Sequence, residues 1–284
     1  GLYYQMANSS ELSGINVFQI FDVGNNTYIY RNQDGIFSFK DGEPQFQSSA
    51  ASQPLSLSAF QPVSAGTTLR DAYLAAMRAY FPPSGGLPDT LFFVRPQYNT
   101  WIELMYNQNQ TDILRYAHAI VDNGFDPGIL MIDDNWQRYY GNFDFKAERF
   151  PDPKAMMDEL HQLGFTVMVW ICPFVSPDSP EYRDLEHKGY LLQNPNGGTA
   201  ILNWWNGYSA CYDLTNPEAL AHFVSVLKGA QERYGIDGFK FDGGDTEHFR
   251  QNAMYSEPWM TDCDFMTAYN LAGEEFPINE FRTG

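Results

Sequence analysis

One pattern recurs three times after about residue 90 and constrains the fold more than any other feature of this chain. A helical segment ends at a glycine, and a short apolar run follows; the helical segments are 110–123, 154–163 and 217–234, and the runs are 128–133, 166–171 and 238–242. A glycine suits the left-handed position that ends a helix. A nearly continuous apolar run is typical of a parallel strand buried on both faces. The pattern therefore predicts successive βα units in a parallel sheet.

Two further strands are expected at the ends of this series, within 91–101 and within 276–282. Successive βα units build either a (β/α)8 barrel or a doubly wound sheet. No glycine-rich phosphate-binding turn follows the first strand, which disfavours the wound sheet. Polar or aromatic residues stand at the carboxyl end of each strand, where barrel active sites lie. We predict an α/β fold: an incomplete (β/α)8 TIM-type barrel of about four to five βα units.

The first 90 residues differ from the rest and are expected to form a short β-rich N-terminal region. The runs 15–21, 27–30 and 35–39 concentrate β-forming residues between turn residues. The uncharged stretch 47–64 is expected to be a loop, and 68–80 a short helix. A Pro- and Gly-rich stretch follows that helix. We therefore divide the chain into residues 1–90 and residues 91–284, the latter being the first half of a barrel.

The composition excludes some classes of partner. Seventeen basic and 35 acidic residues give a formal net charge of −18, which repels a phosphate backbone and disfavours nucleic acid. A neutral ligand such as a sugar meets no such repulsion, and an aromatic content of 16% suits the stacking by which sugars bind. No apolar run reaches the roughly 18–20 residues of a membrane span.

The cysteines and histidines give no sign of a metal site. Cys172, Cys211 and Cys263 are odd in number and unpatterned, and the five histidines lack ligand spacing. We therefore expect no metal, no cofactor and no disulfide framework. The chain begins with glycine rather than methionine, so an export signal removed earlier would leave no trace. Export or a periplasmic location is compatible with this, and the localisation stays open.

Asp242 is the strongest candidate for a catalytic residue. It ends an apolar strand, and alternation puts Lys240 on the same side of that strand. A carboxylate beside a lysine stays ionised, as a nucleophile for the anomeric carbon of a sugar must. The two glycines that follow would let a ligand approach the backbone. The alternative is a buried structural Lys–Asp pair, which the spacing alone does not distinguish from a catalytic one.

Asp133 and Asp134 close the preceding strand 128–133. At least one is expected to face inward and accept hydrogen bonds from sugar hydroxyls; the alternative is that it caps the next segment. Trp170 is expected either to form a wall of the site or to belong to the core. The same two interpretations stand for the run Trp204-Trp205-Asn206, as a stacking platform or as core.

The ordered set of these motifs resembles glycoside hydrolase family 31 from about residue 96 to residue 284. The motifs are Asp-Asp-Asn-Trp at 133–136, Phe-Pro-Asp-Pro at 150–153, Val-Trp-Ile-Cys-Pro-Phe at 169–174 and Gly-Phe-Lys-Phe-Asp-Gly-Gly-Asp at 238–245. The last is similar to the family branch whose nucleophile strand reads Lys-Phe-Asp-Ala-Gly-Glu. A Lys-x-Asp motif alone would be a weak signal, because α-galactosidase families also end their nucleophile strand with it.

The resemblance implies roles for particular residues. Asp242 would be the nucleophile, and Asp133 or Asp134 would bind the sugar before the scissile bond, with Trp170 alongside. Lys240, on the same side of its strand as Asp242, is also expected to contact the substrate. Asp245 stands where the family has Glu, as a supporting polar residue. Arg282 lies in Glu-x-Arg-x-Gly at 280–284, a family strand whose arginine reaches the active site.

The implied activity is that of a retaining α-glycoside hydrolase, acting on α-linked glycosides or oligosaccharides by double displacement. In the family the general acid/base follows the 280–284 strand, so we expect it beyond residue 284, and we expect this chain alone to be inactive. The missing C-terminal half of the barrel is then an expected partner. The alternatives are an α-galactosidase of a related barrel family and a non-catalytic sugar-binding chain or inactive fragment.

Overall fold

The computed structural model describes residues 18–22, 27–32, 35–40, 43–48, 68–80, 82, 85–249, 253–257 and 260–282. Contacts divide the chain into two compact units, Gly1–Gly86 and Leu87–Gly284.

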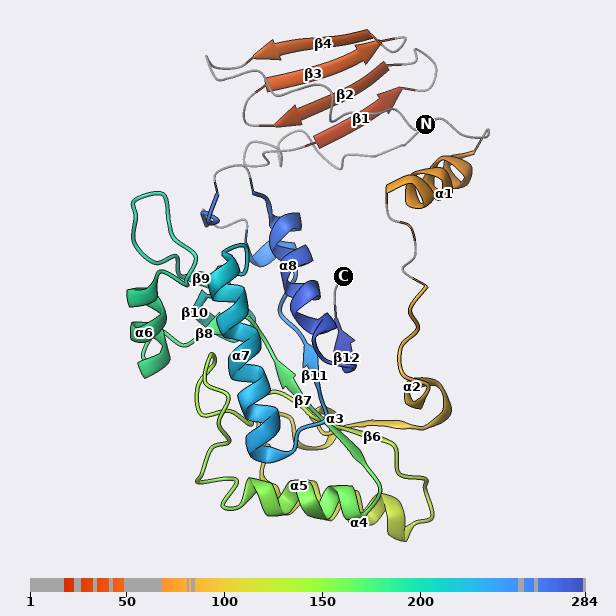
Figure 1. Cartoon of the computed structure of the whole chain (residues 1–284), viewed down its shortest axis with the longest axis vertical. Helices are drawn as coiled ribbons and strands as arrows, with labels where there is room; N and C mark the ends of the chain where they lie inside the picture. The colour runs from red at the N-terminus through yellow and green to blue at the C-terminus, as the bar shows by residue number, and fades with distance from the viewer. Residues whose placement is uncertain are drawn as a thin grey trace. The chain divides into compact units, whose positions relative to one another are not determined.

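The described residues of the first unit form a four-stranded antiparallel sheet and one helix (Figure 1). The strands follow one another in chain order: β1 (Phe18–Asp22), β2 (Thr27–Asn32), β3 (Gly35–Lys40) and β4 (Glu43–Ser48). Helix α1 (Leu69–Tyr80) matches the short helix expected from the sequence. Strand β4 was not expected, because Glu43–Ser48 contains proline and glutamine rather than β-branched residues. The loop predicted over 47–64 therefore began too early, and its residues 49–64 lie outside the described residues.

The second unit alternates strands and helices. Its main elements are β5 (Gln97–Asn99), α4 (Gln110–Asp122), β6 (Ile129–Ile132), α5 (Pro153–Gln162), β7 (Thr166–Ile171), α7 (Pro217–Tyr234), β11 (Gly238–Phe241), α8 (Asp262–Glu274) and β12 (Ile278–Phe281). Short helices α2 (Leu91–Val94) and α3 (Trp101–Leu104) flank β5, and the 3-10 turn η3 (Thr246–His248) follows β11. Between β7 and α7 the chain makes an excursion through β8 (Phe174–Val175), α6 (Pro180–Lys188), β9 (Leu202–Trp204) and β10 (Gly207–Cys211).

Five parallel strands in the order β12-β11-β7-β6-β5 form half of a barrel, with helices interleaved between them (Figure 1). The prediction of an incomplete TIM-type barrel is confirmed. One sheet face, with Leu130, Val169 and Phe239, joins the main core that α4, α5, α7 and α8 cover. On the other face, Ile129, Met131 and Met168 form a separate small cluster. We call this second face the inner face, since it is turned away from the helix layer.

The glycines predicted to end the helices do so. Gly124, Gly164 and Gly235 have φ angles of +80°, +93° and +79°, which L side chains rarely adopt. Each reverses the chain from a helix toward the next strand. The predicted order of helix, glycine and strand is therefore confirmed at these three places. The physical reason given for it, a glycine in the left-handed conformation, is confirmed as well.

The first predicted strand needs correction. Leu91–Val94 is a helical turn rather than a strand, and β5 is limited to Gln97–Asn99. The Oδ1 atom of Asp89 accepts a 2.8 Å hydrogen bond from the backbone N–H of Leu91, which supports the turn. Leu91 packs against the small cluster on the inner face, whereas Phe93 is 72% exposed. An apolar run of four residues does not separate a strand from one helical turn.

No helix within the described ranges is long and apolar enough to cross a membrane. Cys172 and Cys211 are buried, Cys263 is exposed, and all three are free thiols.

Gly238 offers a test of the parallel pairing. It lies opposite Ile278, and a Cβ added at residue 238 would overlap the backbone carbonyl of Ile278. Gly238→Ala should therefore push β12 away from β11 and lower the free energy of unfolding by about 2–3 kcal/mol. Urea denaturation measures the change.

Gly229→Ala is the matched control. Gly229 lies inside α7, and a Cβ there meets no heavy atom within 4 Å. This substitution should raise the free energy of unfolding by about 0.5–1 kcal/mol, because alanine is the better helix former. Equal effects of the two substitutions would contradict the β11–β12 pairing.

Candidate active site

The carboxyl ends of four neighbouring strands carry the candidate residues. Asp133 and Asp134 follow β6, Trp170 lies near the end of β7, Asp242 follows β11 and Arg282 follows β12. Parallel strands open their carboxyl ends onto one edge, which in barrels holds the active site. The hydrogen bonds described below join these side chains across the strands.

Asp242 is 6% exposed, and three donors face its carboxylate. Its Oδ2 atom accepts a 2.8 Å hydrogen bond from the indole N–H of Trp170. Its Oδ1 atom accepts one of 2.8 Å from the backbone N–H of Gly243 and lies 3.4 Å from Nη1 of Arg282. The orientation of both carboxylate oxygens is therefore fixed by three donors: Trp170 on β7, Arg282 directly after β12, and Gly243 in the loop after β11.

The backbone of Asp242 is held as firmly as its side chain. Its N–H donates to the carbonyl of Ile171 at 2.9 Å, and its carbonyl accepts a 2.8 Å hydrogen bond from the hydroxyl of Tyr269 on α8. Gly243 has a φ of +74°, and a Cβ at Gly244 would meet the ring of Tyr269 at 2.8 Å. Gly243 therefore allows the turn after Asp242, and Gly244 allows the close packing of this turn against Tyr269.

Asp133 is the inward-facing member of its pair, on the face that carries Ile129 and Met131. Its Oδ2 atom accepts a 2.8 Å hydrogen bond from Asn99 at the end of β5 and one of 3.3 Å from Nζ of Lys240. Lys240 therefore pairs with Asp133. The alternative interpretation of the sequence, a structural pair between Lys240 and Asp242, is wrong. The lysine side chain is long enough to reach from β11 past β7 to the end of β6.

Glu280 continues this row of charges on the inner face. It lies opposite Lys240 in the register of β11 and β12 and is half-buried. Burial raises the pKa of its carboxyl, and the charges of Asp133 and Asp242 raise it further while Lys240 lowers it. Sequence reasoning missed Glu280 as a site residue, although the alternation that placed Lys240 inward also places Glu280 and Arg282 on that side.

Asp134 faces a different environment from Asp133. The hydroxyl of Tyr140 donates toward both carboxylate oxygens, at 3.1 and 3.2 Å, and the side-chain amide of Asn206 donates to Oδ2 at 2.7 Å. Burial is the main cause that raises the pKa of Asp134 to about 6, against the lowering by these hydrogen bonds. The two adjacent acids therefore have distinct surroundings, and neither caps one of the described helices.

The contacts of Asn206 and Tyr140 with Asp134 were not predicted from the sequence. Asn206 lies 72 residues from Asp134 in sequence, in the turn between β9 and β10. Its side chain also accepts a 2.9 Å hydrogen bond from the hydroxyl of Tyr106. No periodicity marks such a residue; only the excursion after β7 brings it to Asp134. Asn99 was missed too, although its place at a strand end is the same signal that identified Asp133.

Trp170 belongs to the core, and it also contacts the candidate nucleophile. Its side chain is 1% exposed, and its N–H is directed at Asp242. The pair Trp204 and Trp205 divides: Trp204 is stacked on Phe174 with ring centres 4.3 Å apart, whereas Trp205 is 42% exposed. Only Trp205 is available as a surface for stacking.

Arg282 connects several parts of the site. Its Nη1 atom faces Asp242, its Nε lies 3.7 Å from Oδ2 of Asp245, and its guanidinium lies 4.9 Å from the ring centre of Trp205. Asp245, shorter than the glutamate of the resembling family, still comes within ion-pair distance of this arginine.

The arrangement offers a carboxylate with fixed oxygens, beside acceptors and donors suited to a ligand rich in hydroxyl groups. Within the described residues, no group of three or more His, Cys, Asp or Glu side chains is placed to hold a metal ion.

Comparison with known proteins identifies a family. Residues 95–274 match the model of the glycosyl hydrolases family 31 TIM-barrel domain. Myogenesis-regulating glycosidase of Mus musculus is 29% identical over 224 residues, which cover 78% of this chain and 31% of that protein. Alpha-xylosidase XylQ of Lactiplantibacillus pentosus is 26% identical over 152 residues, covering 52% and 20%. This chain therefore spans about a third or less of the length of these relatives.

Solved structures share the fold. A family 31 α-xylosidase from a soil metagenome, complexed with xylose, gives a TM-score of 0.59 at 19% identity, covering 90% of this chain and 39% of that one. A family 36 α-galactosidase from Geobacillus stearothermophilus gives a TM-score of 0.52 at 19% identity, covering 66% and 27%. At these identities the likeness concerns the fold alone.

The raised pKa of Asp134 gives a test by pH. Its folded-state pKa of about 6 exceeds the ordinary value of 3.8, so the folded state binds more protons between these values. The stabilisation is present below about pH 4 and is lost as pH rises through 6; it amounts to roughly 2–3 kcal/mol. The Asp134→Asn variant has no carboxyl group to titrate at this position, so its free energy of unfolding should not fall in this way. The difference in stability between the variant and the wild type should therefore increase in favour of the variant between pH 4 and pH 7.

Urea unfolding between pH 4 and pH 7.5 measures this difference. The control is Asp178→Asn, which removes an exposed carboxylate and should leave the pH profile nearly unchanged. The interpretation fails if Asp134→Asn keeps the wild-type dependence on pH.

Proposed function

The chain belongs to glycosyl hydrolases family 31, and on this premise we propose that it forms the first half of the catalytic barrel of a retaining α-glycoside hydrolase. The observation that carries the proposal is the carboxylate of Asp242 at the end of β11, with Trp170, Gly243 and Arg282 directed at its two oxygens. The names of relatives such as XylQ, an α-xylosidase, support α-linked glycosides as the substrate class.

The proposed mechanism is double displacement with Asp242 as nucleophile. An Asp242 oxygen attacks the anomeric carbon as the bond to the leaving oxygen breaks, which forms a glycosyl–enzyme ester. A second carboxyl group protonates the leaving oxygen and then removes a proton from the water that hydrolyses the ester. The N–H of Trp170 orients the nucleophile before attack, because its hydrogen bond holds Oδ2 in place.

Several neighbours of Asp242 are proposed to bind the sugar. Asp133 accepts hydrogen bonds from sugar hydroxyls while Lys240 compensates its charge. Asp134 supplies a second acceptor, positioned by Tyr140 and Asn206. Asp245 supports Arg282 rather than contacting the sugar. In this arrangement donors and acceptors are oriented before the substrate arrives, which lowers the cost of binding and reaction.

We place the general acid/base outside these 284 residues. In a retaining enzyme it stands about 5–5.5 Å from the nucleophile, and the family has it after the strand that carries Arg282. The coverage of only 31% and 20% of the first two relatives is consistent with a longer catalytic unit. The proposal therefore includes that the chain alone does not turn over glycosides and works with a C-terminal half of the barrel.

Two alternatives remain distinct from this proposal. An α-galactosidase of a related barrel family is supported only by the shared fold, while the family match favours family 31. A non-catalytic sugar-binding protein would keep the polar strand ends without hydrolysis. Release of nitrophenol from a panel of nitrophenyl α-glycosides by the full-length protein decides between hydrolysis and mere binding, and ranks the sugars.

Asp242→Ala in the full-length protein should lower kcat by roughly 10⁴-fold or more, because double displacement cannot proceed without its nucleophile. Azide should restore release of nitrophenol and yield a β-glycosyl azide, since azide attacks from the side that the carboxylate has vacated. Activity measurements with and without azide, together with product analysis, test both expectations.

Asp158→Ala is the control, because Asp158 is half exposed on α5 in an ion pair with Lys154. It should retain wild-type turnover. Near-normal turnover of Asp242→Ala without azide would show that another carboxylate attacks the sugar.

A further inference from the structure

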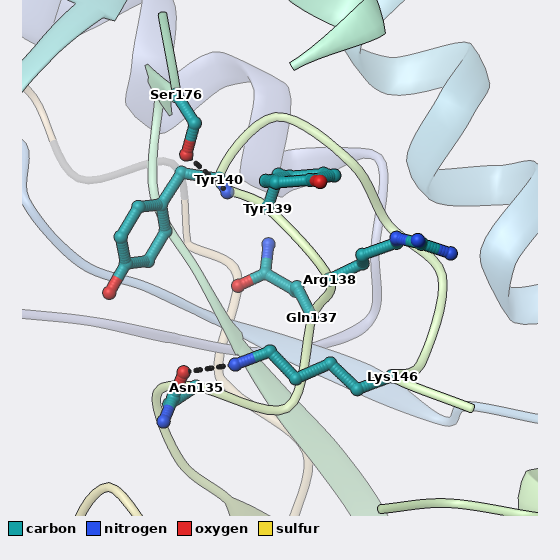
Figure 2. A pocket seen from close by; sticks show the side chains of 7 residues that line it. All are labelled: Asn135, Gln137, Arg138, Tyr139, Tyr140, Lys146 and Ser176. Carbon is teal, nitrogen blue, oxygen red and sulfur yellow. Dashed lines mark hydrogen bonds between the residues drawn. The ribbon is translucent and has the colours of Figure 1, made fainter. Parts of the chain in front are cut away.

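A small polar pocket lies beside the candidate active site, in the loop between β6 and α5 and against the end of β8 (Figure 2). Side chains that line it include Asn135, Gln137, Arg138, Tyr140, Lys146 and Ser176. Tyr140 is shared with the active site: its hydroxyl contacts Asp134, while its backbone N–H donates to Oγ of Ser176 at 3.1 Å. Through Tyr140 the pocket adjoins Asp134, but none of the residues proposed to bind the sugar lines it.

Gln137 is the first observation that points to a ligand. Its side chain is 3% exposed, and neither Nε2 nor Oε1 has a hydrogen-bond partner among the described residues. Figure 2 shows its amide between Tyr140 and Lys146, within the group of side chains that surround the pocket. Buried polar groups are almost always hydrogen-bonded. A molecule in the pocket would satisfy this amide by offering one acceptor and one donor.

The charge of the pocket is the second observation. Lys146 and Arg138 both line it, and none of its lining residues is acidic, although the chain has a net charge of −18. Lys146 is half-buried and donates to Oδ1 of Asn135, which leaves donors of its ammonium group for a ligand. Arg138 is exposed at the rim, and its guanidinium lies 5.8 Å from the ring centre of Tyr139. Within the described part of the chain, neither cation has an ion pair.

We propose that this pocket binds an anionic group, such as a carboxylate, carried by the carbohydrate ligand. The anion accepts hydrogen bonds from Lys146 and Arg138, and a neighbouring sugar hydroxyl donates to Oε1 of Gln137 while another oxygen accepts from Nε2. Charge-assisted hydrogen bonds of this kind are stronger than neutral ones. The proposal rests on the proposed function only in taking the ligand to be a carbohydrate. It adds a specificity site outside the row of residues around Asp242.

Calorimetric titration of the full-length protein tests the proposal with three probes: methyl α-D-glucuronide, methyl α-D-glucoside and sodium sulfate. We expect the carboxylated sugar to bind roughly tenfold or more tightly than the neutral one. Arg138→Gln and Lys146→Met should each remove most of that preference. Arg183→Gln is the matched control, since Arg183 is exposed on α6 and its loss changes the net charge equally; it should preserve the preference.

Two outcomes would overturn the proposal. The first is equal affinity for the charged and the neutral sugar, with no dependence on Arg138 or Lys146. The second is sulfate binding that depends on both cations without any gain for the carboxylated sugar, which would make this a site for free anions. Because Arg138 is exposed, Arg138→Gln keeps the test valid even if Lys146→Met disturbs the fold.

Gln137→Met separates a ligand-binding role from a structural one. Removing a buried amide without partners should raise the thermal unfolding midpoint of the unliganded protein, and it should weaken binding of the carboxylated sugar. A variant that is less stable and binds this sugar as tightly as the wild type would give the amide a structural role and refute the proposal.

Hydrolysis of nitrophenyl α-glucoside is measured in parallel, so that the two hypotheses fail separately. Turnover of this neutral substrate without a preference for the charged sugar would reject the pocket and leave the proposed function intact. If turnover is absent but the carboxylated sugar still binds more tightly in a way that depends on Arg138 and Lys146, the enzymatic function is rejected and the pocket is retained.

Discussion

The candidate site depends on the in-register parallel pairing of β6, β7, β11 and β12. This pairing places Lys240 opposite both Trp170 and Glu280. Two residues further along their strands, Asp242 and Arg282 therefore reach the same edge of the sheet. No residue of the site is close in sequence to all the others. The sheet supplies their proximity, and the helices behind it supply the buried area that keeps the strands paired.

Charged side chains gather near this edge, and most of them lie in ion pairs. Asp133 is paired with Lys240, and Asp242 and Asp245 lie close to Arg282. Removing one member would leave an uncompensated buried charge, which is costly. Asp134, which does not lie on the inner face, has only neutral donors, and burial raises its pKa to about 6. Such a carboxyl changes charge near neutral pH.

The sequence predicted well those features that follow from local physics. A glycine with positive φ ends a helix for reasons contained in a few residues, so the reversals at Gly124, Gly164 and Gly235 were predictable. The alternation along β11 likewise placed Lys240 and Asp242 on one face. The prediction was wrong at Leu91–Val94, because a short apolar run fits a helical turn as well as a strand. It did not foresee that Gly244 packs against the ring of Tyr269, a contact that depends on where α8 lies.

The sequence by itself determined the order of βα units, the strand ends that carry carboxylates and the motifs that resemble one family, because these depend on spacing along the chain. Only the tertiary structure decided which charges pair. Lys240 contacts Asp133 rather than its neighbour Asp242, since a side chain on β11 reaches across β7 to the end of β6. It likewise decided that Asn206, from a turn in the excursion after β7, binds Asp134. Spacing is local, whereas pairing depends on which strands lie side by side.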